Sequence, residues 1–331
     1  MRVLIIGGTG AFSGRVTERV VRAGHQVTLY NRGQRPLPEG VRVPVIRGER
    51  SELRRSADAI AAFAPEAVID SICFKPEDAE DLAALFPGAR RVVFISSVDA
   101  YGEDIGAAPV TEERAPTPVS DYGKKKLDCE QVLLKALGSA VSIFRPSHIL
   151  GRGFLTTSLW SRSPFLVDRI RKGKPIPAID GGRNLMTPVH AADIAEWIAR
   201  ALESPAADGQ VFNAVGPEIV CQRRYYEIIA ESLGAELRLV AVPSHLFRRH
   251  FASPPQFNWH RPYSCAKAVS RLGHAPQFTP EKMLGETVAH MLERGLVRDC
   301  SEDPFDDRLV ALLLRHEEEL GSLLEAKKQG A

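Results

Sequence analysis

Tyr122 and Lys126 are a pair of residues whose types and spacing suggest chemistry. They stand four positions apart in a segment of helical pattern, so their side chains share one face of the helix. A tyrosine hydroxyl titrates near pH ~10 and is a poor base at neutral pH. A neighbouring ammonium lowers that pKa and makes the hydroxyl usable for proton transfer. Because Tyr-x-x-x-Lys also arises by chance, the pair needs support from elsewhere in the chain.

A glycine-rich turn at the start of the chain predicts a dinucleotide site. The apolar run 2–6 ends in the turn 7–14, after which valines recur at helical spacing. Glycine lets a diphosphate approach the backbone, and the N–H groups at a helix N-terminus bind it. Ser13 replaces the usual third glycine, with Gly14 beside it. A purely structural turn is the alternative, but the strand–turn–helix context favours dinucleotide binding.

The segment after the second predicted strand, 26–30, bears on the choice of cofactor. Asn31 and Arg32 follow it, at the position where this kind of fold meets the adenosine ribose. A carboxylate there would favour NAD and repel a 2′-phosphate, but none is present. Arg32 is suited to a phosphate, so we expect NADP(H) to be favoured and NAD(H) to bind more weakly. An exposed turn arginine without a ligand is the alternative.

Strands and helices alternate along the elements that must position these residues. Further strands are predicted at 41–46, 65–71, 91–95 and 140–144. Helices are predicted at 76–86 and after a cap at Ser120 or Asp121. This order predicts an α/β fold, a Rossmann-type doubly wound parallel sheet. Ligands of such sheets bind at the carboxyl ends of the strands, which is where Ser97 follows the strand 91–95.

Composition excludes several classes of protein. The 331 residues are 44% apolar and 25% charged with a net charge of +2, which gives no reason to expect nucleic acid or membrane as partner. No apolar run reaches the ~20 residues of a membrane helix. Five scattered cysteines predict a reduced, cytoplasmic protein without structural zinc. His190 and Asp193 lack a third ligand in the sequence, so we expect no metal.

Several motifs occur together in one order. Ser-Ser-x-x-x-Tyr-Gly lies at 96–102, Tyr-x-x-x-Lys at 122–126 and Arg-Pro-x-x-x-x-Gly at 145–151, all after the glycine turn. With 188–195, 211–213 and 266–273, they make the chain resemble the extended short-chain dehydrogenase/reductase family over residues 1–295. Within that family it is similar to the NAD(P)-dependent sugar-nucleotide epimerases and dehydratases.

The resemblance implies a role for each matching residue. Ser97 would hydrogen-bond the reacting oxygen, Tyr122 would transfer its proton, and Lys126 would bind the nicotinamide ribose and lower the tyrosine pKa. Glu49 stands where many members place an aspartate against the adenine. The implied cofactor contacts are Gly7, Thr9, Gly10, Ala11, Phe12, Ser13, Asn31, Arg32, Glu49, Ser71, Ile72, Ser96, Tyr122, Lys126, Pro146 and His148. The expected substrate contacts are Cys73, Asp99, Arg183 and Arg261.

The chain also departs from the family pattern. Val98-Asp99 replaces the Asp-Glu pair of the sugar 4,6-dehydratases, which argues against that reaction. Residues 71–74 lack the His-x-Ala-Ala of many epimerases, and Met186-Thr187 replaces the usual Arg-Asp. We therefore expect an outlying subgroup with an unusual substrate site.

The resemblance implies a two-part architecture. Residues 1–146 and a strand near 210–215 would form the dinucleotide-binding domain, 147–209 and 217–300 an interleaved α/β substrate domain, and 301–331 a C-terminal amphipathic helix. The leucine stripe of that helix is expected to pack on its own domain, with an oligomer contact left open; a homodimer is expected.

Three functions follow from this reading. The first is oxidoreduction or epimerisation at a carbinol of a sugar-nucleotide-like substrate. The second is NADPH-dependent reduction of a small ketone or natural-product intermediate. The third is a non-catalytic nucleotide-binding or RNA-associated role on the same fold.

Overall fold

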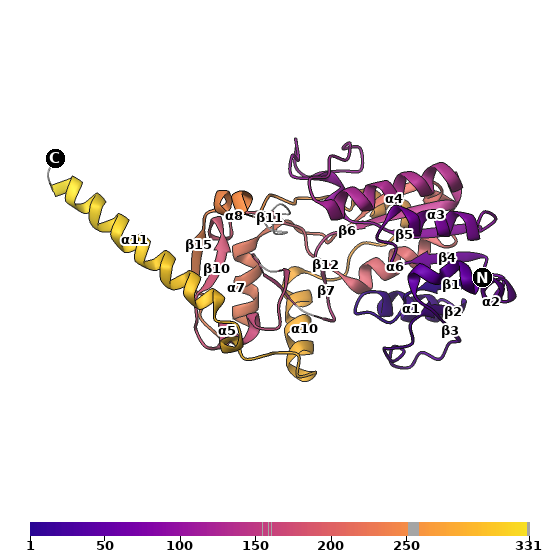
Figure 1. Ribbon diagram of the computed structural model, residues 1–331, viewed down its shortest axis with the longest axis horizontal. Helices are drawn as coiled ribbons and strands as arrows, with labels where there is room; N and C mark the ends of the chain where they lie inside the picture. The colour runs from indigo at the N-terminus through magenta and orange to yellow at the C-terminus, as the bar shows by residue number, and fades with distance from the viewer. Residues whose placement is uncertain (154, 158, 160, 251–257, 330–331) are drawn as a thin grey trace. The chain divides into compact units, whose positions relative to one another are not determined.

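The computed structural model describes residues 1–153, 155–157, 159, 161–250 and 258–329. The chain divides into two compact units (Figure 1). The first comprises Met1–Arg152, Thr187–Ile219 and Arg261–Thr279, and the second Gly153–Met186, Val220–His260 and Pro280–Ala331.

The first unit is built on a seven-stranded parallel sheet of order β13-β6-β5-β4-β1-β2-β3 (Figure 1). Its strands are β1 Arg2–Ile6, β2 Gln26–Asn31, β3 Val45–Arg47, β4 Ala67–Asp70, β5 Arg91–Ile95, β6 Val141–Pro146 and β13 Gln210–Ala214. The strand order reverses beside β1, so the switch point where such folds bind ligands lies between β1 and β4. The predicted Rossmann-type α/β fold is confirmed.

Helices cover both faces of this sheet, as the alternation of side chains along β1 requires. Val3 and Ile5 pack into the cluster with α1 Ser13–Arg22, α6 Ala191–Ala201 and α9 Ala266–Leu272. Leu4 and Ile6 pack into the opposite cluster. The helices of that second face are α2 Ala57–Phe63, α3 Pro76–Leu85 and α4 Asp121–Leu137. Short elements of the unit are β7 Ile149–Leu150, β12 Val189–His190, η1 Arg50–Ser56, η2 Val98–Tyr101, η3 Gly138–Ala140 and η5 Pro205–Ala207.

The second unit is smaller and contains short strand pairs and helices. The parallel pair β10 Ile176–Ile179 and β15 Leu239–Val242 holds a small core that includes Leu159. The other strands are β8 Thr156–Thr157, β9 Ser161–Arg162, β11 Leu185–Met186 and β14 Val220–Cys221. The helices are α5 Leu166–Arg171, α7 Gln222–Ser232, α8 Ser244–His250, α10 Pro280–Glu293 and α11 Phe305–Gln329, with η4 Asp180–Gly182 and η6 Cys300–Glu302.

Four segments predicted for the substrate domain lie in the first unit: 147–152, 187–209, 217–219 and 261–279. The two longer ones belong there because α6 packs against α1 and α9 packs against β13. The strand predicted at 41–46 is observed only at Val45–Arg47. Pro44 has no N–H to donate to a sheet, which explains the late start of this edge strand. Among the described residues, no helix has the length and apolarity needed to cross a membrane.

Candidate active site

The glycine turn between β1 and α1 is too crowded for side chains. Gly7 has a φ of +100° and Gly8 a φ of +88°. A Cβ on Gly7 would lie 2.4 Å from the Oγ of Ser71, which itself donates to the Ile6 carbonyl. Ser13, at the third glycine position, accepts a hydrogen bond from the Gly10 N–H through its Oγ at 3.0 Å. Serine therefore stabilises the turn at this position instead of merely being tolerated.

A cavity of about 350 Å³ opens beside this turn, at the carboxyl ends of β1, β2 and β4. The predicted cofactor residues that line it are Gly7, Thr9, Gly10, Ser13, Asn31, Arg32, Glu49 and Ile72. Gln34, Arg35, Arg50 and Phe74 line it as well, and the sequence analysis missed them. For Arg35, the signal was the second arginine of Arg-x-x-Arg in the turn after β2. We call this cavity the cofactor pocket.

The three arginines of the cofactor pocket differ in their partners. Arg50 is bound by the buried Asp70 carboxylate, with Nη2 to Oδ2 at 2.9 Å, and donates to the Asp78 carbonyl at 2.6 Å. Arg32 and Arg35 are exposed, and neither forms an ion pair with any residue that the structure describes. Arg35 reaches the glycine turn, since its Nη1 lies 3.9 Å from the place a Cβ on Gly10 would take. Two uncompensated positive charges therefore face the pocket.

Asn31 and Glu49 hold the wall of the pocket together. The Asn31 amide donates to the Gly7 carbonyl at 2.9 Å and accepts from the Gly33 N–H at 2.8 Å. The Tyr30 hydroxyl donates to the Glu49 carbonyl at 2.8 Å, while Glu49 itself faces the pocket. Asn31 is thus committed to the turn, and the arginines are the groups left for an anionic ligand.

Tyr122 and Lys126 lie on the first turns of α4. The helix begins where the Ser120 Oγ accepts from the Gly123 N–H at 3.0 Å, which confirms the predicted cap. Tyr122 is 42% exposed, whereas Lys126 is 2% exposed and lies with its Nζ 5.8 Å from the centre of the Tyr122 ring. The helix therefore presents the tyrosine to solvent and buries the lysine behind it.

The Lys126 ammonium is held between two strand ends. Its Nζ donates to the carbonyls of Cys73 at 2.7 Å and Ile95 at 2.8 Å. It also lies 4.6 Å from the centre of the Phe74 ring, a residue of the cofactor pocket. Burial lowers the pKa of Lys126, and the nearby Asp70 carboxylate opposes this. Cys73 is fully buried, so its carbonyl serves the site and its thiol is out of reach of a substrate.

Ser97 and Asp99 follow β5 and pack against the start of α4. The Ser97 Oγ accepts from the Asp99 N–H at 3.1 Å and caps η2. A Cβ on Gly123 would lie 2.4 Å from the Asp99 carbonyl, so only glycine allows this approach. The close contact brings the segments that carry Ser97 and Tyr122 together.

Behind Ser97 lies a set of buried polar groups that the sequence analysis did not single out. The Glu130 carboxylate, on α4, accepts hydrogen bonds from the Arg145 Nε at 2.9 Å and from the Ser96 hydroxyl. Arg145 lies 4.6 Å from the centre of the Tyr101 ring, and the Tyr101 hydroxyl donates to Asn213 at 2.8 Å. Burial raises the pKa of Tyr101 to about 12, so it stays protonated. These contacts connect α4 to the ends of β5, β6 and β13.

Asp99 and Arg261, both expected to contact substrate, form an ion pair with each other. The pair is nearly fully buried, with side chains 10% and 4% exposed. The Arg261 carbonyl accepts from the Thr187 hydroxyl at 3.0 Å, which fixes the segment. A phosphate would have to compete with Asp99 for this guanidinium. We call two ion pairs, Glu130–Arg145 and Asp99–Arg261, together with Ser96 the buried charge network.

The remaining predicted residues do not line the cofactor pocket. Phe12 precedes α1, and its carbonyl accepts from the Arg15 N–H at 2.9 Å; Ala11 stands beside it. Pro146 ends β6, and the His148 carbonyl accepts from the Val189 N–H at 2.9 Å. Arg183 belongs to the second unit, where it lines a cavity of about 490 Å³ with Arg223 and Glu317.

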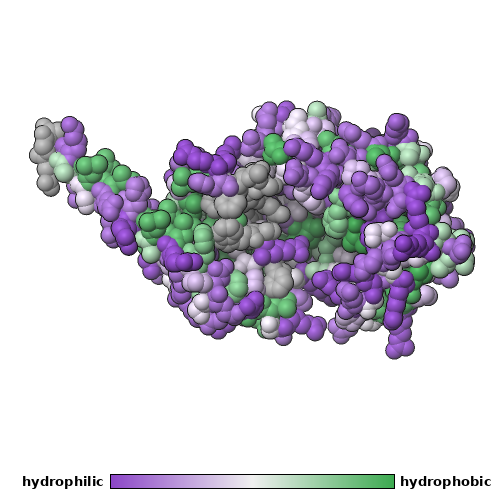
Figure 2. Space-filling view, viewed as in Figure 1, coloured by the Kyte–Doolittle hydropathy of each residue, from purple (hydrophilic) through white to green (hydrophobic). Residues whose placement is uncertain are grey.

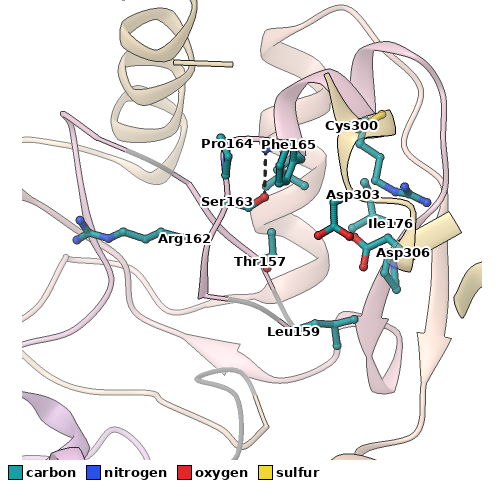
Figure 3. A pocket seen from close by; sticks show the side chains of 13 residues that line it. Thr157, Leu159, Arg162, Ser163, Pro164, Phe165, Ile176, Cys300, Asp303 and Asp306 are labelled. Atoms are coloured by element: carbon teal, nitrogen blue, oxygen red, sulfur yellow. Dashed lines mark hydrogen bonds between the residues drawn. The ribbon is translucent and has the colours of Figure 1, made fainter. Parts of the chain in front are cut away.

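Two other places in the described residues hold groups that could bind ligands. A cavity of about 110 Å³ in the second unit is lined by Thr157, Ile176, Cys300, Asp303 and Asp306, among others, and by none of the predicted site residues (Figure 3). Asp168, Asp299 and Cys300 lie within 4.8 Å of one another, at a spacing that metal ligands could adopt. The Lys172 ammonium binds both carboxylates, at 2.7 and 2.8 Å, and supplies the compensating charge.

His190 and Asp193 have structural partners. The Nδ1 of His190 accepts from the Ala192 N–H at 3.2 Å at the start of α6. The Asp193 carboxylate accepts from the Gln277 N–H at 2.9 Å and lies 3.0 Å from His274. Both residues are used in capping and packing around α6.

The parallel sheet, its glycine turn and the Tyr122–Lys126 helix define a Rossmann-type enzyme of the extended short-chain dehydrogenase/reductase class. The chain belongs to the NAD dependent epimerase/dehydratase family, whose sequence model matches residues 3–214.

Relatives and solved structures give the setting within that family. The chain is 31% identical to 2'-dehydrokanamycin reductase of Streptomyces kanamyceticus over 249 residues, 74% of this chain and 70% of the relative. It is 27% identical to chloroplast stem-loop binding protein of 41 kDa b of Arabidopsis thaliana, over 94% of this chain and 84% of that protein. The fold matches UDP-glucose 4-epimerase of Thermotoga maritima, solved with UDP-glucose, with a TM-score of 0.72 at 18% identity, covering 89% of this chain and 99% of that one.

Proposed function

We propose that the protein is an NADP(H)-preferring oxidoreductase that acts on a carbinol or ketone carbon of a sugar-containing substrate, with Ser97, Tyr122 and Lys126 as its catalytic residues. The observation that carries the proposal is the position of Phe74. This residue lines the cofactor pocket, and its ring lies 4.6 Å from the Lys126 ammonium on the helix that also bears Tyr122. The pocket and the proton-transfer residues therefore adjoin.

The residues of the cofactor pocket fit a dinucleotide phosphate. A diphosphate would lie on the glycine turn, where no Cβ fills the space beside the backbone at Gly7 and Gly8. Arg32 and Arg35, exposed and without ion-pair partners among the described residues, would hold the 2′-phosphate. When bound, NADP(H) supplies or accepts the hydride.

The catalytic residues manage the proton that accompanies the hydride. The Tyr122 hydroxyl gives its proton to the substrate oxygen in reduction and takes it back in oxidation. The Ser97 hydroxyl would donate a hydrogen bond to the same oxygen, and its Oγ is already oriented by the Asp99 N–H. Lys126 stabilises the tyrosinate form, which a buried ammonium does more strongly than one in water.

Net reduction is the direction that we favour. Two arginines for a 2′-phosphate suit NADPH, and the relative at 31% identity is a 2'-dehydrokanamycin reductase. Epimerisation, which removes and returns a hydride on one sugar carbon, is the second candidate, because the fold is that of a UDP-glucose 4-epimerase. An RNA-associated role is the third candidate, because one relative is named for stem-loop binding. A net charge of +2 offers little attraction for RNA, which argues against this role.

Tyr122→Phe tests the proposal. General acid–base groups contribute ~10²–10⁴-fold, so we expect the variant to lose at least about a hundredfold in kcat while NADPH affinity stays within a few-fold. NADPH oxidation would be followed with 2'-dehydrokanamycin, and conversion of UDP-glucose would be followed separately with NAD and NADP. Lys126→Ala, which removes the ammonium that stabilises the tyrosinate, should also lower kcat, and Lys125→Ala is its matched control, since Lys125 is exposed on the same helix. A Tyr122→Phe enzyme that retains full turnover on a substrate of the wild type would overturn the assignment.

A further inference from the structure

The C-terminal helix α11 consists of an anchored part and an uncovered part. Its beginning packs into the core of the second unit, where Leu309 and Leu313 lie against Ile179 and Val242. Asp307 strengthens this attachment by accepting from Arg169 and Lys174, both at 2.6 Å. The first turns of α11 are therefore fixed to β10 and β15.

From Leu314 to Lys328 every residue of α11 is exposed. Leu320, Leu323 and Leu324 are 45%, 67% and 70% exposed. Figure 1 shows this part of α11 running beyond β10 and β15, and Figure 2 shows hydrophobic residues gathered along it. An isolated helix of about 15 residues is marginal in water, and exposed leucines add to the cost. This part of the helix needs a partner surface.

Four leucines of α11 share one line along the helix. Leu309, Leu313, His316, Leu320, Leu323 and Lys327 are separated alternately by four and three residues, so the leucines fall on this line with His316 and Lys327 as its polar positions. That is the spacing of a helix that packs against a second helix along one seam. The anchored part of α11 uses the first two positions inside its own unit, and the same seam continues uncovered beyond them.

We propose that the uncovered part of α11 pairs in antiparallel orientation with the same helix of a second copy of this chain. The charges favour this partner and this orientation. Glu317, Glu318 and Glu319 form an acidic block, and Lys327 and Lys328 a basic one. A parallel pair would place the two acidic blocks opposite each other, where like charges repel.

In the antiparallel pair the leucines of the seam meet, and each acidic block lies towards the basic block of the second copy. When Leu320 faces Leu323 of the second copy, His316 faces Lys327, and Glu317 comes within reach of the basic block. Four turns of helix bury less than the ~800 Å² per partner of a standard interface, so this dimer should dissociate on dilution.

Sedimentation velocity of the full-length protein tests the pairing. The wild type should shift from the monomer mass towards twice that mass as its concentration is raised. Leu320→Glu combined with Leu323→Glu should remain monomeric over the same range, while its fold is preserved because Leu309 and Leu313 are unchanged. Glu318→Gln combined with Glu325→Gln, on the opposite face of α11, is the matched control and should dimerise like the wild type. A monomeric wild type, or a leucine variant that dimerises normally, would overturn the proposal.

A charge exchange tests the orientation. Glu317→Lys should raise the dimer dissociation constant several-fold, because it places a cation near the basic block of the second copy, besides adding one to the cavity that Glu317 lines with Arg183 and Arg223 in its own unit. Adding Lys327→Glu should restore the wild-type constant. In a parallel pair Glu317→Lys would instead relieve repulsion, so a tighter dimer would refute the antiparallel arrangement.

Discussion

The cofactor pocket and the buried charge network lie at the same edge of one sheet, but their arginines differ in whether a carboxylate of the chain neutralises them. In the pocket, Arg32 and Arg35 are exposed and have no ion-pair partner among the described residues. In the network, Arg145 and Arg261 are each neutralised by a buried carboxylate. The chain leaves charge open where a ligand is to supply the counter-charge. It compensates charge internally where the charge fixes the position of other groups.

The difference has an energetic meaning. Removing one partner of a buried ion pair leaves the other charge unpaired in a low-dielectric interior, at a cost of about 3–5 kcal/mol. Removing an exposed arginine changes stability by less than about 0.5 kcal/mol. Variants in the network should therefore lose stability and turnover together, whereas variants in the pocket should lose only affinity for the cofactor.

The largest effect on stability is expected from Glu130→Gln. The glutamine keeps the shape and can still accept from Ser96, but it leaves the Arg145 guanidinium buried without a counter-charge. We expect the free energy of unfolding to fall by about 3 kcal/mol in urea titrations, at the lower end for a broken buried pair. Glu52→Gln is the control, because the exposed pair between Glu52 and Arg55 should contribute at most about 1 kcal/mol. If both variants lost the same free energy of unfolding, the buried pair would stabilise the protein no more than the exposed one, contrary to this prediction.

Arg261→Ala should have a comparable or slightly smaller effect, since Asp99 lies closer to the surface than Glu130. We expect about 2–3 kcal/mol lower stability and a fall in kcat, because Asp99 also orients Ser97 through its backbone N–H. Adding Asp99→Asn should recover part of the stability, as the lone carboxylate is then gone. If Arg261 binds a substrate phosphate instead, the single variant would raise KM, with stability and kcat unchanged.

The sequence predicted the local parts of this architecture well. The glycine turn, the Ser120 cap and the shared face of Tyr122 and Lys126 depend on residues within a few positions of one another, so periodicity and turn chemistry reveal them. The parallel, doubly wound sheet followed from the alternation of strands with helices. These features carry most of the nucleotide-binding fold.

The Asp99–Arg261 pair of the network escaped sequence reasoning because its two residues are remote in the chain. Asp99 and Arg261 are separated by 162 positions, and neither residue type reveals its partner. From the sequence alone, Arg261 is therefore assigned to the substrate. Arg35 was missed for another reason: an exposed arginine in a turn is ordinary until the fold brings it beside the glycine turn.

The smallest effect on stability, and the clearest effect on binding, is expected in the pocket. Arg32→Ala and Arg35→Ala should each lower the affinity for NADPH about ten- to a hundredfold, because a charge-assisted contact to phosphate contributes about 1.5–3 kcal/mol. NADH, which lacks the 2′-phosphate, should bind the variants as it binds the wild type. Calorimetric titration of the purified protein with both cofactors measures this.

Two comparisons make the cofactor result specific. Arg54→Ala removes an exposed arginine that pairs with Asp81 and does not line the pocket, so it should leave both affinities unchanged. In the wild type, a higher salt concentration should lower the affinity for NADPH more than the affinity for NADH. The difference between these two salt effects should be smaller in each pocket variant, because the lost contact is the one that salt screens. If the wild type binds NADH as tightly as NADPH, the two arginines are surface residues of a turn. The contrast between open and compensated charge would then hold for the network alone.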